Sequence, residues 1–303
     1  MTNTRRQFLQ TLGAGAVASR LPAAEENRFR LAICNETFDG WNFRDACAGA
    51  IRFGYAGLEI SPFTLAEDPS TVTPQRRKAL KHIMASEGVE YVGLHNLMKA
   101  PAGLHLTTPD AGLRNRSWEL FAKLVDLAAD LGDDPLMIFG SSKQRDAKRV
   151  GATVADAKKR LVEGFVSIAP HAEQRGVKIL MEPLAPHLCD VVNTLGEAVE
   201  IVDQVNSPAV RSMFDTHNAV AETEPHGDVI KKYLPYIQHV HINEMDGRHP
   251  TTGSYDFVPV LQALKDVKFQ HWVSLEVFKF KPSPEEVARV SERFLRETEA
   301  GLT

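Results

Sequence analysis

Cysteine is scarce in this sequence, and its spacing excludes the usual cysteine chemistry. The 303 residues hold three cysteines, Cys34, Cys47 and Cys189, which form no CxxC pair and no zinc-ribbon spacing. An odd and scattered set argues against a disulfide framework, and a chain of this length can hold its core together without one. We therefore expect the three thiols to be buried as small hydrophobic side chains.

An excess of positive charge is also missing. There are 39 acidic and 35 basic residues, which gives a formal net charge of -4. No global positive field is present to attract nucleic acid or anionic lipid, so we expect neither as a partner. No apolar run reaches the length of a transmembrane helix, so no membrane span is expected in the mature protein. The balance favours an enzyme that acts on a small molecule, although only weakly.

The sequence has no GxGxxG turn, no internal repeat and no Pro/Gly/Ser-rich linker. What it has instead is an alternation of short β-rich apolar runs with longer amphipathic stretches, such as 114–131, 155–175 and 284–296. Eight such alternations predict a single α/β domain, a (β/α)₈ TIM barrel over residues 28–303, rather than a doubly wound open sheet. The eight predicted strands are Phe29–Cys34, Gly57–Ile60, Glu90–His95, Leu136–Gly140, Val177–Glu182, Val210–Asp215, Ile237–Ile242 and Trp272–Val277.

Residues 1–27 differ from the rest of the chain. The segment Thr4-Arg5-Arg6-Gln7-Phe8-Leu9 resembles a twin-arginine export signal, and the weakly apolar run 11–18 follows it. We therefore expect residues 1–27 to be a signal peptide and disordered N-terminus, and the mature enzyme to be periplasmic or secreted. The alternative is a basic, disordered N-terminus on a cytoplasmic protein.

Four consecutive late strands of the predicted barrel end on a residue that can bind a metal. Barrel active sites form at the carboxyl ends of the strands, and neighbouring strands lie only about 5 Å apart. Three carboxylates brought together there would repel one another unless a cation joined them. Three carboxylates and one imidazole make a mostly oxygen site, which suits Mn²⁺, Mg²⁺ or Co²⁺ better than structural Zn²⁺. The predicted ligands of one divalent ion are Glu182, Asp215, His241 and Glu276.

The residues around these four positions resemble the xylose-isomerase-like superfamily of sugar isomerases and epimerases, which includes D-tagatose 3-epimerase, hydroxypyruvate isomerase and inosose dehydratase. The resemblance covers the chain from about residue 28 and is strongest after residue 177. It also includes Gly57-Leu58-Glu59-Ile60 on the second predicted strand. The main matching segments are Met181-Glu182-Pro183, Phe214-Asp215-Thr216-His217, His239-Val240-His241-Ile242-Asn243-Glu244 and Ser274-Leu275-Glu276-Val277.

The resemblance implies roles for individual residues. Glu182 and Glu276 would move protons at carbon through an enediolate, and all four predicted ligands would hold the ion, most plausibly Mn²⁺, with Mg²⁺, Co²⁺ or Zn²⁺ as alternatives. The family's substrate-binding residues include a histidine shortly after the ligand aspartate and an arginine in the loop after the ligand histidine. His217 and Arg248 lie within one position of these places and are the predicted substrate-binding residues. Members also commonly form dimers or tetramers, so the resemblance implies a homo-oligomer as one assembly of this chain.

Placement at a strand end adds further candidates for the substrate pocket. His95 ends the third predicted strand and Glu36 follows the first, so both are predicted to line the pocket. Trp41 and Phe63 lie in loops on the same face. Their rings could stack on a sugar or simply anchor the loops.

The implied function is a divalent-metal-dependent isomerase or epimerase of a small sugar or polyol. No Gly-rich phosphate cradle follows the last strands, so the substrate is expected to carry no phosphate. In the ketose 3-epimerases another glutamate follows the first ligand by six residues, where this chain has Leu188. This difference leaves open a lyase or hydratase that acts on a 3-keto-glycoside by β-elimination. A non-catalytic sugar-binding barrel and a repair nuclease with the same fold are weaker alternatives.

Overall fold

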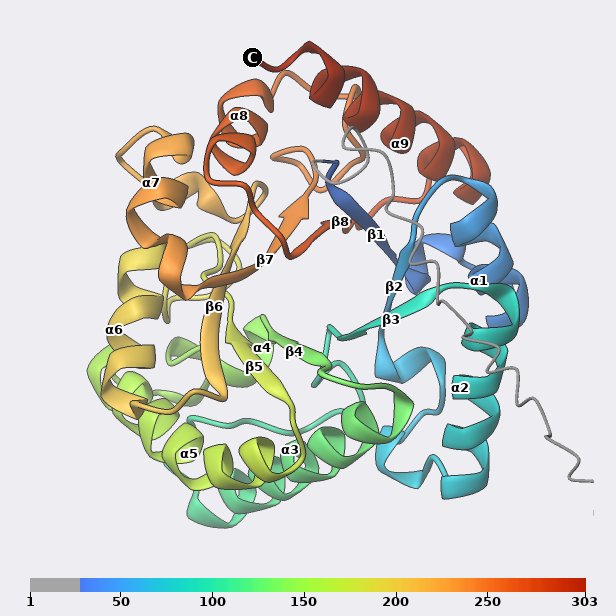
Figure 1. The fold of residues 1–303 in the computed structure, drawn as a ribbon. Coiled ribbons are helices and arrows are strands. Elements are labelled where there is room, and N and C mark those ends of the chain that lie inside the picture. The colour runs from blue at the N-terminus through green and yellow to red at the C-terminus, as the bar shows by residue number, and fades with distance from the viewer. Residues whose placement is uncertain (1–27) are drawn as a thin grey trace, which may run out of the picture.

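The computed structural model describes residues 28–303, which form a closed barrel of eight parallel strands in the order β1 to β8. The predicted signal segment, residues 1–27, lies outside the described residues. Helices surround the barrel, and α9 closes the ring beside α1 and α8 (Figure 1). The predicted (β/α)₈ fold is confirmed. The strands are β1 (Arg30–Cys34), β2 (Gly57–Ile60), β3 (Glu90–Leu94), β4 (Leu136–Phe139), β5 (Lys178–Met181), β6 (Val210–Asp215), β7 (Ile237–Ile242) and β8 (Trp272–Leu275).

Helices follow the strands, and the longer ones cover the outer face of the barrel. They are α1 (Phe43–Arg52), α2 (Pro74–Glu87), α3 (Ala111–Leu131), α4 (Ser142–Arg145), α5 (Val154–Gln174), α6 (Leu195–Val205), α7 (His226–Tyr233), α8 (Val258–Asp266) and α9 (Pro284–Gly301). Two short 3₁₀ helices, η1 (Asn35–Phe38) and η2 (Pro62–Thr64), follow β1 and β2. Among the described helices, none is long and apolar enough to cross a membrane.

Local sequence explains where the helices begin. The side chains of Thr73, Asp110 and Thr153 cap α2, α3 and α5 by accepting backbone N–H groups of the first turn. At α6, Thr194 and Glu197 form a complete capping box. Because Asp110 caps it, α3 begins at Ala111, three residues before the predicted start.

Strands β2, β4 and β8 are buried along their whole length, since side chains fill the barrel interior and helices cover its outside. The predicted bounds of β2, β6 and β7 match the structure, and the other strands are one or two residues shorter. Glu182 and Glu276 therefore follow the last ladder residues of β5 and β8 rather than belonging to them. All three cysteines are free and buried, as predicted.

Candidate metal and substrate site

The four predicted ligands converge at the carboxyl end of the barrel. In the β6–β7 ladder Asp215 is the partner of His241, and in the β7–β8 ladder His241 is the partner of Ser274, two residues before Glu276. One ligand atom from each of the four residues lies within 4.8 Å of the others. Their side chains are nearly inaccessible, with residue exposures of 5% or less. The geometry thus brings together Glu182, Asp215, His241 and Glu276.

The electrostatics of this group fit a bound cation. Burial, followed by the negative charges of Glu276 and Asp215, raises the pKa of Glu182 well above its usual value. Burial and Glu276 likewise raise the pKa of Asp215. Oε2 of Glu276 and Nδ1 of His241 are buried without a hydrogen-bond partner and lie 3.1 Å apart. A divalent ion would neutralise the carboxylates, and Oε2 of Glu276 and Nδ1 of His241 could both bind it. The oxygen-rich set of donors suits such an ion.

His241 is held in place by Glu59 on β2. Nε2 of His241 donates a hydrogen bond to Oε2 of Glu59 at 3.0 Å, and Nε2 of His239 donates to Oε1 at 2.9 Å. Burial opposes a charge on His241, but Glu276 and Glu59 outweigh it and raise the pKa of the imidazole well above its usual value. Because Nε2 is the donor, Nδ1 faces the carboxylates. The role of Glu59 was not predicted, although a glutamate within a buried apolar strand was a usable signal.

Two further residues that sequence reasoning missed support Glu182. The Asn218 amide donates to Oε1 of Glu182 at 3.1 Å and to Oδ2 of Asp215 at 2.9 Å. The fully buried Arg145 donates to the backbone carbonyl of Glu182 at 2.8 Å. These contacts fix the end of β5 and the direction of the carboxylate it presents.

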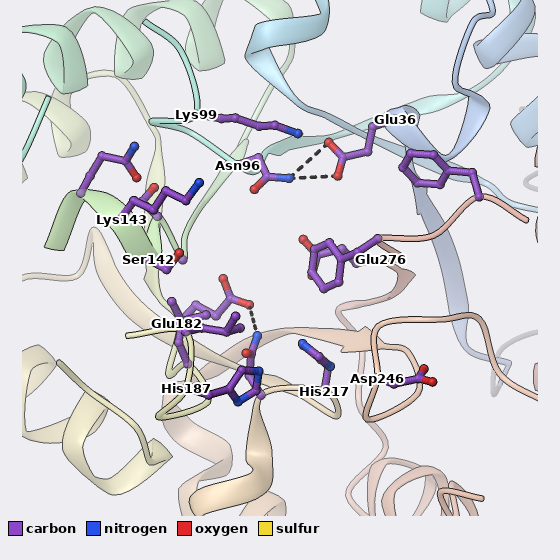
Figure 2. A pocket seen from close by; sticks show the side chains of 18 residues that line it. Glu36, Asn96, Lys99, Ser142, Lys143, Glu182, His187, His217, Asp246 and Glu276 are labelled. Carbon is purple, nitrogen blue, oxygen red and sulfur yellow. Dashed lines mark hydrogen bonds between the residues drawn. The ribbon is translucent and has the colours of Figure 1, made fainter. Parts of the chain in front are cut away.

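Two of the four residues, Glu182 and Glu276, line a cavity of about 620 Å³ together with His217. Figure 2 shows Glu182 and Glu276 on two sides of the open centre, with His217 between them and Glu36 and Lys99 farther up the wall. Cavities of about 300–1,000 Å³ typically hold small organic ligands. The cavity is therefore ample for a sugar beside the metal group.

Two of the predicted substrate residues line this cavity. The backbone N–H of His217 donates to Oδ1 of Asp215 at 2.7 Å, and its ring lies 5.4 Å from the ring of Phe278. Glu36 accepts hydrogen bonds from Asn96 at 2.9 Å and from the hydroxyl of Ser61. Burial would raise the pKa of Glu36, but His95, the hydroxyl of Ser61 and the charge of Lys99 lower it to about 2, so its carboxylate is ionised.

The other two predicted substrate residues, His95 and Arg248, do not line the cavity. His95 is fully buried behind Glu36, with Nε2 2.8 Å from the hydroxyl of Ser61, because its strand turns the ring into the barrel core. Nε of Arg248 donates to Asp246 at 2.6 Å at the surface, and it is Asp246 that reaches the cavity. Neither residue lines the cavity in this structure, and a role of His95 or Arg248 in substrate binding stays a prediction.

Several lining residues were not among the predicted substrate residues. The wall includes Leu188, at the position where the ketose 3-epimerases have a glutamate, with His187 beside it. Lys99 reaches the cavity from the loop after β3, and Lys143 reaches it from the short helix α4. A lysine in a polar loop resembles any solvated lysine, so only the folded barrel reveals that these two face the site.

Curated proteins that resemble this chain include sugar epimerases. The chain is 25% identical over 268 residues to a probable ketose 3-epimerase of Synechocystis, a match that covers 82% of this chain and 88% of that protein. It is 30% identical over 119 residues to the D-psicose 3-epimerase of Enterocloster bolteae, a match that spans only 40% of that protein and 39% of this chain.

Solved structures show the same fold. The 3-keto-D-glucoside 4-epimerase of E. coli superimposes with a TM-score of 0.76 at 16% identity, over 89% of this chain and the whole of that one. At this identity the likeness concerns the fold alone. The family model of xylose isomerase-like TIM barrels matches residues 47–298. The chain belongs to the family of xylose isomerase-like TIM barrels.

Proposed function

We propose that this protein is a divalent-metal-dependent isomerase or epimerase of a small, non-phosphorylated sugar or polyol. The observation that carries the proposal is the convergence of Glu182, Asp215, His241 and Glu276, whose ligand atoms lie within 4.8 Å of one another at the end of a sugar-sized cavity. The similarity to ketose 3-epimerases supports the same class of reaction. Mn²⁺ suits three carboxylates and one imidazole, and Mg²⁺ or Co²⁺ would also fit.

When bound, the ion would supply Lewis acidity toward a carbonyl and a neighbouring hydroxyl of the sugar. The chain's own residues supply the proton transfers. Glu182 and Glu276 come from β5 and β8 and flank the cavity, so a sugar between them presents opposite faces of a carbon to the two carboxylates. One carboxylate removes the proton next to the carbonyl, which leaves an enediolate, and the other returns a proton to the opposite face.

The remaining polar residues would orient the substrate and its acid–base groups. Asn218 restrains Glu182 by its hydrogen bond of 3.1 Å, which limits the directions in which the carboxylate can act. His217 and the ionised Glu36 offer a donor or an acceptor to sugar hydroxyls at the cavity wall. Phe278 covers one side of the cavity and would exclude water from the reacting carbon.

Hydrogen–deuterium exchange in Mn²⁺-loaded protein tests this function directly. A panel of free ketoses incubated in D₂O should yield an epimer that carries deuterium at the carbon next to the carbonyl, detected by NMR. Glu182→Gln together with Glu276→Gln should abolish the exchange, and so should chelation of the metal. Full activity in metal-stripped protein would contradict the proposal, because the four-residue group would then have no purpose.

A second candidate is a lyase of the same chemistry. The apolar Leu188 lies in the cavity wall, and a cavity of about 620 Å³ is larger than a free hexose needs. On a 3-keto-glycoside, the proton next to the ketone would leave to a glutamate, and the glycosidic oxygen would depart with the C–O electrons and take up a proton. Release of the aglycone from a 3-keto-glucoside would favour this candidate, and its absence would eliminate it.

Export from the cytoplasm is part of the proposal. We infer it from the twin-arginine-like segment Thr4–Leu9. Twin-arginine export carries folded proteins, which suits an enzyme that acquires its metal before it leaves the cytoplasm. Fractionation of cells that express the full chain, compared with an Arg5→Lys/Arg6→Lys variant, tests it. Retention of the wild-type chain in the cytoplasm would contradict export.

A further inference from the structure

A second cavity adjoins the metal pocket. It has a volume of about 340 Å³ and lies beside η1, η2 and the loop before α1. Glu36, Lys99 and Phe280 line both this side cavity and the metal pocket. A ligand in the metal pocket could therefore extend past these three residues into the side cavity and remain in contact with the protein.

Both aromatic and polar side chains line the side cavity. Its aromatic residues are Phe38, Trp41, Phe43, Phe63 and Phe280. Its polar residues are Asn35, Glu36, Asp39, Thr64 and Lys99. A sugar ring presents apolar C–H faces and a rim of hydroxyls, which calls for aromatic surface and hydrogen-bonding side chains together.

Several of these side chains are held in place before any ligand binds. Trp41 packs against Phe38 with ring centroids 5.1 Å apart. Nζ of Lys99 lies 3.9 Å above the ring of Phe63. Asn35 donates to the hydroxyl of Thr64 at 2.9 Å and accepts the backbone N–H of Ser61 at 2.8 Å. Such preorganisation lowers the entropic cost of binding.

We propose that the side cavity is a subsite for a second sugar ring, so that the natural substrate is a glycosylated sugar rather than a free monosaccharide. The inference rests on the proposed function, since it assumes that the reacting sugar occupies the metal pocket. Asp39, Glu36 and Thr64 are better suited to the hydroxyls of a pyranose than to a purely apolar aglycone.

Binding of ketose disaccharides tests the subsite. Fructose is compared with 4-, 5- and 6-O-glycosyl fructoses, namely lactulose, leucrose and isomaltulose, by titration into Mn²⁺-loaded protein. We expect at least one disaccharide to bind about tenfold more tightly than fructose. Phe63→Ala should reduce this preference to about one. Val166→Ala, which shortens an exposed apolar side chain on α5, is the control and should keep the preference.

Intrinsic fluorescence locates the second ring. Of the three tryptophans, Trp41 lines the side cavity, whereas Trp118 and Trp272 pack on α3 and at the start of β8. The preferred disaccharide should change the emission, fructose should not, and Trp41→Phe should remove the response. Equal affinity for fructose and every disaccharide would overturn the subsite and leave the proposed function standing. Failure of every sugar to bind would contradict the proposed function itself.

Discussion

Oε2 of Glu59 accepts a hydrogen bond from Nε2 of His241 at 3.0 Å, deep inside the barrel. The other oxygen of the same carboxylate accepts from His239 at 2.9 Å, so both oxygens are engaged by imidazole donors. In the neutral, metal-binding form of His241, the hydrogen bond holds the ring proton on Nε2 and leaves Nδ1 to bind a metal. Carboxylates that hold a ligand histidine in this way commonly tune metal affinity.

Replacement of Glu59 by glutamine should weaken metal binding. The amide has only one oxygen, so its NH₂ group would face one of the two ring N–H donors and disturb the orientation of His241. We expect Mn²⁺ affinity to fall by about 10- to 100-fold, measured by titration of metal-free protein. Glu90→Gln changes an exposed glutamate on the neighbouring strand and is the control. Unchanged affinity in Glu59→Gln would show that His241 needs no such support.

The metal group was predictable because it depends on strand ends. All four residues follow or end an apolar run, namely Glu182, Asp215, His241 and Glu276. The barrel brings equivalent strand ends together regardless of the conformations of the loops. Glu59 was visible in the sequence only as a buried charge. Its partners come from β7, on another side of the barrel, so its role depends on which residues point inward.

The pocket wall was less predictable, because the conformations of long loops decide it. His95 directly follows β3 and Arg248 lies in the loop after β7, but a residue at a strand end can turn inward and a loop arginine can pair locally. His95 is buried, and Arg248 pairs with Asp246. Conversely, Trp41 was considered either a stacking ring or a loop anchor. The structure shows it packed on Phe38 and also lining the side cavity.

Neutralising Glu182 should stabilise the metal-free protein at high pH. Burial and neighbouring carboxylates raise the folded-state pKa of Glu182 above its unfolded value. Ionisation is therefore disfavoured in the folded state, and stability is lost as the pH rises from about 4.3 through the folded pKa. We expect Glu182→Gln to match the wild type near pH 4 and to melt a few degrees higher at pH 8, measured by calorimetry in chelator.

Saturating Mn²⁺ should reverse this order. An ion at a hundred times its Kd stabilises the folded state by about 2.7 kcal/mol, so wild-type protein should gain several degrees in Tm. Glu182→Gln lacks one ligand and should gain much less. An equal gain in both proteins would place the ion elsewhere.

Glu36 should contribute to acid stability. Its pKa is lowered from 4.5 to about 2 because the contacts with His95, Ser61 and Lys99 outweigh the effect of burial. A lowered folded-state pKa gives stability that is present above the unfolded value and is lost as the pH falls through about 2. A shift of this size corresponds to roughly 3 kcal/mol.

Denaturant titrations at several pH values check this contribution. Wild-type protein should lose the stabilisation between about pH 5 and pH 2. Glu36→Gln should be less stable than the wild type at pH 6, and the difference should shrink as the pH falls. A difference that does not depend on pH would mean that Glu36 stabilises the fold by packing alone.

Replacement of Gly140, which follows β4, by alanine should weaken metal binding without preventing folding. A methyl group at this position would overlap Oε2 of Glu182. That oxygen is the far end of a side chain that can rotate, so Gly140→Ala should fold with a Tm within a few degrees of the wild type while its Glu182 carboxylate is displaced. We expect Mn²⁺ affinity and any epimerase activity to fall at least tenfold. Gly301→Ala, where a methyl group meets no atom within 4 Å, is the control and should bind metal normally. Normal metal affinity in Gly140→Ala would mean that Glu182 contributes little to holding the ion.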